Sequence, residues 1–212
     1  MTSPAAPAPR MDRRLVVLLA VTCGVAVSSL YVAQPLLDTI GNAFRVSDGT
    51  AGLLVTASQL GYVVGLALLV PLGDLLERRR LIVGLLVLAA LGQVVSALAP
   101  GFAVLAASLA LVGVTSAVAQ IVVPLAASLA AEDERGQVVG TVMSGLLVGI
   151  LLARTLSGLL AEVGGWRLVF AAVAAALLVL AAVLWRFPPS HTSPPRCGRR
   201  VGRRSCSRTT TA

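Results

Sequence analysis

The chain has 212 residues, of which 57% are hydrophobic and only 12% are charged, and its mean hydropathy is +0.92. A soluble domain carries about twice that charged fraction, so the composition excludes an ordinary soluble fold. The net charge of +8 could suggest nucleic-acid binding, but many of the arginines lie in the last residues, 186–212, outside any expected core. We therefore expect no nucleic-acid partner and interpret the charge through membrane topology.

Six long apolar runs predict six transmembrane helices. Their expected limits in chain order are 14–36, 51–72, 81–98, 102–128, 137–160 and 167–186. Each run is long enough, at about 1.5 Å per residue, to cross a hydrocarbon core of about 30 Å. Backbone groups in lipid must be satisfied internally, and no stretch alternates with period two, which excludes a barrel. The predicted fold class is an all-α membrane protein, a six-helix bundle.

The domain organisation follows from these limits. Residues 1–13 are predicted to form a cytoplasmic N-terminal tail, and residues 14–186 the transmembrane domain. Residues 187–212 are rich in Arg, Pro, Ser and Thr, so they are predicted to be a disordered basic cytoplasmic tail.

The arginines also predict the orientation of the bundle. With the N-terminus in the cytoplasm, the segments outside the membrane on the far side hold only Arg45 and Arg167. The inside segments hold fourteen arginines, seven of them in residues 186–212. Loops rich in arginine stay in the cytoplasm. We expect a multi-pass protein of the inner (plasma) membrane with both termini cytoplasmic.

Polar residues inside the predicted spans are the candidate functional residues, because polar groups in lipid either join helices or line a path. Arg154 falls inside the fifth span and is expected to face the bundle interior or an aqueous cavity, with a polar partner among Gln34, Gln59 and Gln120. The first span is expected to carry a polar stripe on one face, formed by residues three or four apart: Ser28, Tyr31, Gln34 and Asp38. Pro35 and Pro124 each free a carbonyl one turn earlier in their helices. The candidate residues of a substrate or ion path are Tyr31, Gln34, Asp38, Gln59, Tyr62, Gln120 and Arg154. The alternative for each is hydrogen bonding between helices without a ligand.

An intramembrane enzyme is the first rival class. A serine protease needs a serine and a histidine in the bilayer, but the only histidine is His191, in the polar tail. Cys23, Cys197 and Cys206 show no metal-ligand spacing. We therefore expect no enzyme, no metal and no cofactor. A channel or a purely structural membrane protein stays open as an alternative.

The loop between the second and third spans carries a motif. In "VPLGDLLERRRLI" (70–82), Asp74, Arg78 and Arg79 match the signature Gly-x-x-x-Asp-Arg-x-Gly-Arg-Arg of the major facilitator superfamily, which the chain resembles. Val70, Leu75 and Glu77 depart from that signature. The resemblance implies that Asp74, Arg78 and Arg79 belong to a gating loop, in which Asp74 contacts the start of a helix in the second half.

Further stretches resemble the efflux-type branch of this family, which includes drug and sugar antiporters. They are "YVAQPLLDTIGNAF" (31–44), "TASQLGYVVGLALLVPLGD" (56–74), "GTVMSGLLVGILLARTLSG" (140–158) and "GWRLVF" (165–170). The resemblance implies proton-coupled efflux of a small drug-like or sugar-like molecule. Two family features of proton-coupled members are missing: an arginine near Leu109, and a Gly-Pro pattern where Ala153 and Arg154 stand.

The resemblance also implies a partner. The family has twelve spans in two halves, so we expect this chain to be an N-terminal half that needs its C-terminal half or a second copy. The basic tail resembles a truncated or out-of-frame end. An inactive fragment, or a six-helix protein that does not transport, is the remaining alternative.

Overall fold

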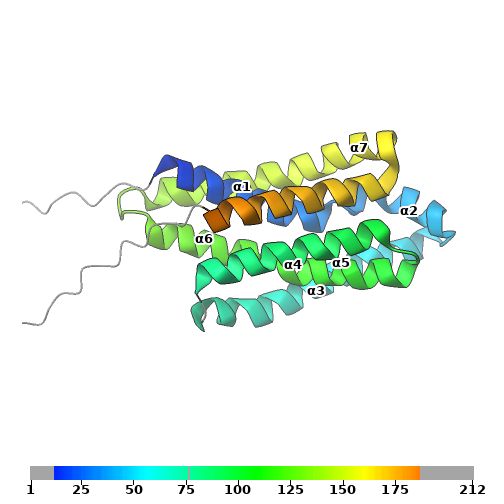
Figure 1. The fold of residues 1–212 in the computed structure, drawn as a ribbon, viewed down its shortest axis with the longest axis horizontal. Coiled ribbons are helices and arrows are strands. Elements are labelled where there is room, and N and C mark those ends of the chain that lie inside the picture. The colour runs from blue at the N-terminus through cyan, green and yellow to red at the C-terminus, as the bar shows by residue number, and fades with distance from the viewer. Residues whose placement is uncertain (1–11, 76, 187–212) are drawn as a thin grey trace, which may run out of the picture.

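The computed structural model describes residues 12–75 and 77–186, which form a bundle of long helices (Figure 1). The elements in chain order are α1 (Arg13–Tyr31), the 3-10 turn η1 (Gln34–Leu36), α2 (Leu37–Phe44), α3 (Asp48–Leu75), α4 (Arg78–Leu98), α5 (Phe102–Ser116), α6 (Val118–Leu129) and α7 (Arg135–Arg186). Residues 1–11 and the predicted basic tail at 187–212 lie outside the described residues.

The six predicted spans correspond to these helices. Five continuous helical stretches of the described chain are long and apolar enough to cross a membrane, and the last is the 52-residue α7. Gly165 interrupts α7 with φ 70° and ψ 178°, a backbone conformation open almost only to glycine. Figure 1 shows α7 folding back on itself. The two parts of α7, before and after Gly165, therefore supply the fifth and sixth spans, and the six-helix fold class is confirmed.

Two spans are not straight helices. The first changes from α1 to η1 and then α2 around Pro35, because proline cannot donate a backbone hydrogen bond to the preceding turn. The fourth changes from α5 to α6 at Ala117, before Pro124. The break at η1 interrupts the helical face expected to join Ser28 to Asp38, whereas Pro124 lies inside α6, seven residues after the break at Ala117.

The contacts between the first three spans and the last three follow an internal repeat. The first span, α1, packs mainly on the first part of α7, whereas α3 packs mainly on α5. The third span, α4, packs on the second part of α7. Such an internal three-plus-three repeat is a known way to build half of a two-half transporter.

A pair of glycines four residues apart lies at each of the two related contacts. A Cβ on Gly61 or Gly65 would collide with backbone atoms of α5, and one on Gly145 or Gly149 with backbone atoms of α1. Small residues let membrane helices approach closely, and close packing is a main source of their association. The glycine spacing read from the sequence therefore serves packing in this structure.

Apolar side chains form two buried clusters along the bundle. One includes Leu19, Leu86 and Val122. The other includes Ile40, Leu105 and Phe170, and Trp166 is buried in it between Phe44 and Phe170.

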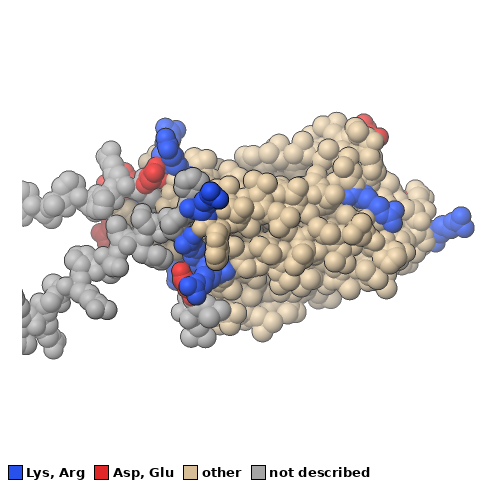
Figure 2. All heavy atoms as spheres, in the orientation of Figure 1, with Lys and Arg blue, Asp and Glu red and all other residues tan. Residues whose placement is uncertain are grey.

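Charged side chains gather at one end of the bundle, where α1 and α4 begin and α7 ends (Figures 1 and 2). The arginines at the starts of α1, α4 and α7 and at the end of α7 are Arg13, Arg14, Arg78, Arg79, Arg80, Arg135 and Arg186. Most of the visible length between the two ends lacks charge (Figure 2). The start of α1 and the end of α7 share this end, which fits an even number of spans.

Candidate functional site

Arg154 and Gln34 join the fifth span to the first. The Arg154 Nη2 donates a hydrogen bond to Gln34 Oε1 at 2.9 Å. At about 1.5 Å per residue, Arg154 lies about 17 Å along the helix from the Gly165 break. An arginine near the membrane centre costs about 2.5–3.5 kcal/mol on insertion scales, so a polar partner is needed. The expected polar partner of Arg154 is confirmed.

Arg154 does not lie in the interior of the described bundle, and the other expectation, that it faces an aqueous cavity, stays a prediction. Its side chain is exposed on the surface of the described chain, whereas its neighbour Ala153 is buried. Val142, Ala153 and Ser157 belong to the buried stripe of this helix. Successive residues are about 100° apart on a helix, so Arg154 falls at the edge of that stripe, beside the first span.

Tyr62 and Gln120 form a second polar pair, between α3 and α6. The Gln120 Nε2 donates to the Tyr62 hydroxyl at 3.0 Å. Gln120 is exposed and Tyr62 is half-buried. Gln120 follows the break at Ala117, where the chain passes from α5 to α6. The four polar residues therefore form two pairs, each between neighbouring spans, with exposed groups in both.

The other candidates of the predicted path do not join these pairs. Gln59 is exposed on α3, and Asp38 is exposed in the first turn of α2. Tyr31 is half-buried and packs against the core. Within residues 12–75 and 77–186, no hydrogen bond links these three side chains to Arg154 or Gln120. The turn at η1 separates Asp38 from the helical face of α1, and the roles of Tyr31, Asp38 and Gln59 in a path stay predictions.

The predicted gating-loop residues have different surroundings. Asp74 lies in the last turn of α3, and its side chain is outside the described residues. Arg78 is half-buried at the first position of α4. Arg79 Nη2 donates to the backbone carbonyl oxygen of Trp185 at 2.5 Å, and its guanidinium lies 6.0 Å from the Trp185 ring centroid. Arg79 therefore links the start of α4 to the end of α7.

A buried polar network was missed by sequence reasoning. Gln93 is fully buried on α4, and its Nε2 donates to the Ser29 carbonyl oxygen at 3.0 Å. The Ser29 and Ser116 hydroxyls lie 3.2 Å apart. This network joins α1, α4 and α5 in the core, which is the role of polar side chains as interhelical links. A glutamine in the third span was the available signal.

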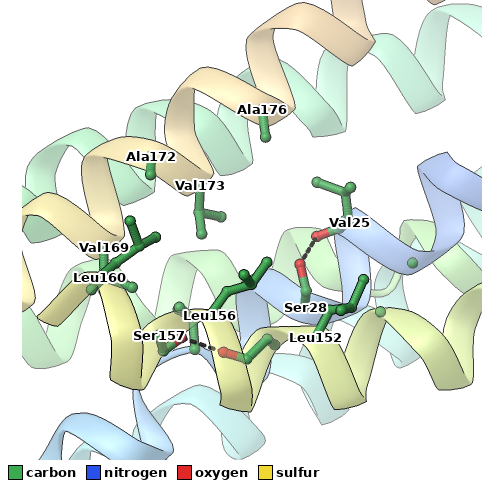
Figure 3. A pocket seen from close by; sticks show the side chains of 14 residues that line it. Val25, Ser28, Leu152, Leu156, Ser157, Leu160, Val169, Ala172, Val173 and Ala176 are labelled. Atoms are coloured by element: carbon green, nitrogen blue, oxygen red, sulfur yellow. Dashed lines mark hydrogen bonds between the residues drawn. The ribbon is translucent and has the colours of Figure 1, made fainter.

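An apolar pocket of about 220 Å³ lies between α1 and the two parts of α7. Val25 and Ser28 line it from α1, and Leu156 and Val173 from α7 (Figure 3). Ser28 donates to the Val25 carbonyl oxygen at 2.8 Å, and Ser157 donates to the Ala153 carbonyl oxygen. Both hydroxyls are therefore satisfied by their own helices. The pocket contains neither polar pair.

Comparison of the sequence with known proteins gives a matching family and several relatives. The family model described as Major Facilitator Superfamily matches residues 16–209. The chain is 53% identical over 187 residues to the uncharacterized transporter YgaY of Escherichia coli O157:H7, covering 88% of this chain and 48% of that protein. It is 27% identical over 160 residues to a probable sugar efflux transporter of Helicobacter pylori (strain HPAG1), covering 75% of this chain and 41% of that protein.

A solved structure shares the fold. It is the crystal structure of a bacterial homolog to the human lysosomal transporter Spinster, in an inward-facing and occupied conformation. The TM-score is 0.77 at 20% identity, over 85% of this chain and 45% of that chain. The chain thus spans about half the length of the relatives it matches.

Proposed function

The chain belongs to the major facilitator superfamily, and from this membership we propose that it supplies one wall of the substrate path of a secondary active transporter for a small molecule. It is a multi-pass membrane protein of a transporter family and not an enzyme. The observation that carries the proposal is the pair of polar contacts, Arg154–Gln34 and Gln120–Tyr62, whose exposed members lie on otherwise apolar spans.

The exposure of these groups supports a path more than a purely structural role. Polar side chains that only join helices are expected to be buried between them, as Gln93 and Ser116 are. Arg154 and Gln120 are instead exposed on this chain. Exposed polar groups on apolar spans are unfavourable in lipid and favourable beside water or protein. We propose that the surface bearing them faces a second six-helix half, or a second copy, across the path.

We propose efflux as the direction, supported by the efflux name of the Helicobacter pylori relative, and protons as the driving ion. All nine carboxylates of the chain lie at positions 12, 38, 48, 74, 77, 132–134 and 162, near the ends of the spans. A proton-exchanging carboxylate in the membrane centre is therefore expected on the second half. We also propose that both termini are cytoplasmic, supported by the arginines at one end of the bundle (Figure 2).

The test is reconstitution in liposomes of the 212-residue chain, alone and co-expressed with the second half of its E. coli relative. The expected result is saturable transport driven by a proton gradient, in the paired protein only. Cationic dyes, sugars and organic anions are the substrates tested. Tyr62→Phe and Gln120→Leu are expected to lower this flux, whereas Val179→Ala, an exposed apolar control on α7, is not. Non-saturable conductance would favour a channel, and flux by the chain alone would favour a homodimer.

A further inference from the structure

Arg154 is the one charged residue of the sequence within the central part of a span. The other sixteen arginines lie at helix ends, in connecting segments or in the terminal segments, and the carboxylates lie near the span ends. Within the described residues, no carboxylate forms an ion pair with Arg154, and its hydrogen-bonding partner is the neutral amide of Gln34. The charge of Arg154 is therefore not neutralised by a protein group in this part of the chain.

The geometry of the guanidinium leaves room for a ligand. Arginine has five N–H donors in a planar fork, and Gln34 occupies one of them. The side chain is exposed, and a Cβ added at Gly158, one turn further along the same face, would meet no heavy atom within 4 Å. A planar fork with free donors matches the two oxygens of a carboxylate, or those of a phosphate, better than it matches a neutral ligand.

From these observations we propose that Arg154 is a binding residue for the negatively charged group of a small anionic substrate, a carboxylate or phosphate ester. This inference rests on the proposed function, because it assigns a substrate class to the same path. Gln34 orients the guanidinium from η1, and the anion neutralises a charge that a cationic or uncharged substrate would leave unpaired. Interactions between ions are strong where little water screens them, so the charge of Arg154 selects the anion.

Asp38 is the carboxylate nearest to this pair along the chain, one turn beyond Gln34. It is exposed in the first turn of α2 and does not form an ion pair with Arg154. A nearby negative charge opposes the binding of an anion. Neutralising Arg154 is therefore expected to abolish anion binding, and neutralising Asp38 to leave it unchanged or strengthen it, a contrast that a merely structural role of Arg154 does not require.

The experiment uses a reporter thiol in the full chain. Cys197 and Cys206 are changed to serine, buried Cys23 is kept, and Gly158→Cys places a thiol beside Arg154. The protein is paired with a cysteine-free second half of its E. coli relative and reconstituted in phosphatidylcholine liposomes. The rate of labelling by a neutral, water-soluble maleimide is then measured with benzoate or its uncharged counterpart benzamide. Gly140→Cys is the matched control reporter, because a Cβ there also meets open space and position 140 lies about 27 Å before position 158 in the same helix.

The expected result is protection of the thiol at position 158 by benzoate and not by benzamide. Mass action predicts labelling about fourfold slower at a benzoate concentration of about three times its Kd. Arg154→Gln abolishes the protection, Asp38→Asn keeps or strengthens it, and the thiol at position 140 is unaffected. Equal protection by benzamide, no protection by benzoate, or protection that persists in Arg154→Gln would overturn the anion site.

Two further outcomes separate the possible failures. If the maleimide labels position 140 but never position 158, no aqueous path reaches Arg154, and the proposed function fails together with the inference. If position 158 is labelled but benzoate has no effect, the inference fails alone. Phosphatidylglycerol liposomes test the lipid phosphate as the anion: protection by this lipid without benzoate would replace the soluble substrate by a headgroup.

Discussion

Arg79 and Arg167 cap opposite ends of one pair of helical segments, α4 and the second part of α7. Arg79, at the start of α4, donates to the backbone carbonyl oxygen of Trp185 at the end of α7. Arg167, after the Gly165 break, donates to the carbonyl oxygens of Ala97 and Ala99 at the end of α4, each at 3.1 Å. The last carbonyls of a helix lack intrahelical partners, and a cation there also interacts favourably with the helix dipole.

Removing either capping arginine should destabilise the bundle. We expect Arg167→Gln and Arg79→Gln each to lower the free energy of unfolding by about 1–3 kcal/mol, because carbonyl groups lose hydrogen bonds from a charged donor. Arg80→Gln is the control: Arg80 is exposed and pairs with Glu77 at 2.8 Å, and such a surface pair contributes about 0–1 kcal/mol. Thermal unfolding in detergent measures all three. Equal loss in Arg80→Gln would show that net charge, not capping, is responsible.

The glycine contacts predict a second stability effect. Gly149→Ala places a Cβ against the backbone of Gly24 on α1, so the two helices must separate. We expect a loss of about 1–3 kcal/mol, as for overpacked cores. The matched control is Gly158→Ala, on the same helix, where a Cβ meets no atom within 4 Å. If Gly149→Ala and Gly158→Ala unfold at the same midpoint, the close-packing role of Gly149 is contradicted.

The break at Gly165 is a third target. Its φ of 70° and ψ of 178° are strained for any residue with a Cβ, so Gly165→Ala is expected to lower stability by about 1–3 kcal/mol. Gly164→Ala is not a suitable control, because its Cβ would meet the Leu168 side chain. Gly136→Ala, at an open position near the start of α7, serves instead. If Gly165→Ala leaves the folding yield and the unfolding temperature unchanged, the break of α7 at Gly165 is contradicted.

The orientation of the bundle gives a fourth prediction. Because arginine-rich segments stay in the cytoplasm, reporter fusions after residues 46, 100 and 164 are expected to report outside, and fusions after 77, 134 and 190 inside. A matched pair of reporters, one active only in the cytoplasm and one only outside it, is fused at each site. A reversed pattern would overturn the proposed orientation while leaving the six-helix fold intact.

The sequence by itself determined the architecture. Apolar runs long enough to cross the bilayer predict helices wherever they occur, since lipid leaves backbone groups no other partner. The six spans are therefore readable from hydropathy alone, and the motif around Asp74 and Arg78 points to the family that the comparison confirms. Arg154 stands out for the same reason, because a charge within an apolar run needs a partner.

Only the tertiary structure decided which polar groups meet. Helical spacing places side chains on a face of their own helix, but it does not fix which face packs against which neighbour. The glycines let α1 approach the fifth span closely, and that approach puts Gln34 within hydrogen-bonding distance of Arg154. The turn at η1 separates Asp38 from the same stripe. Contacts between distant spans depend on helix breaks and backbone approach, which the hydropathy pattern does not encode.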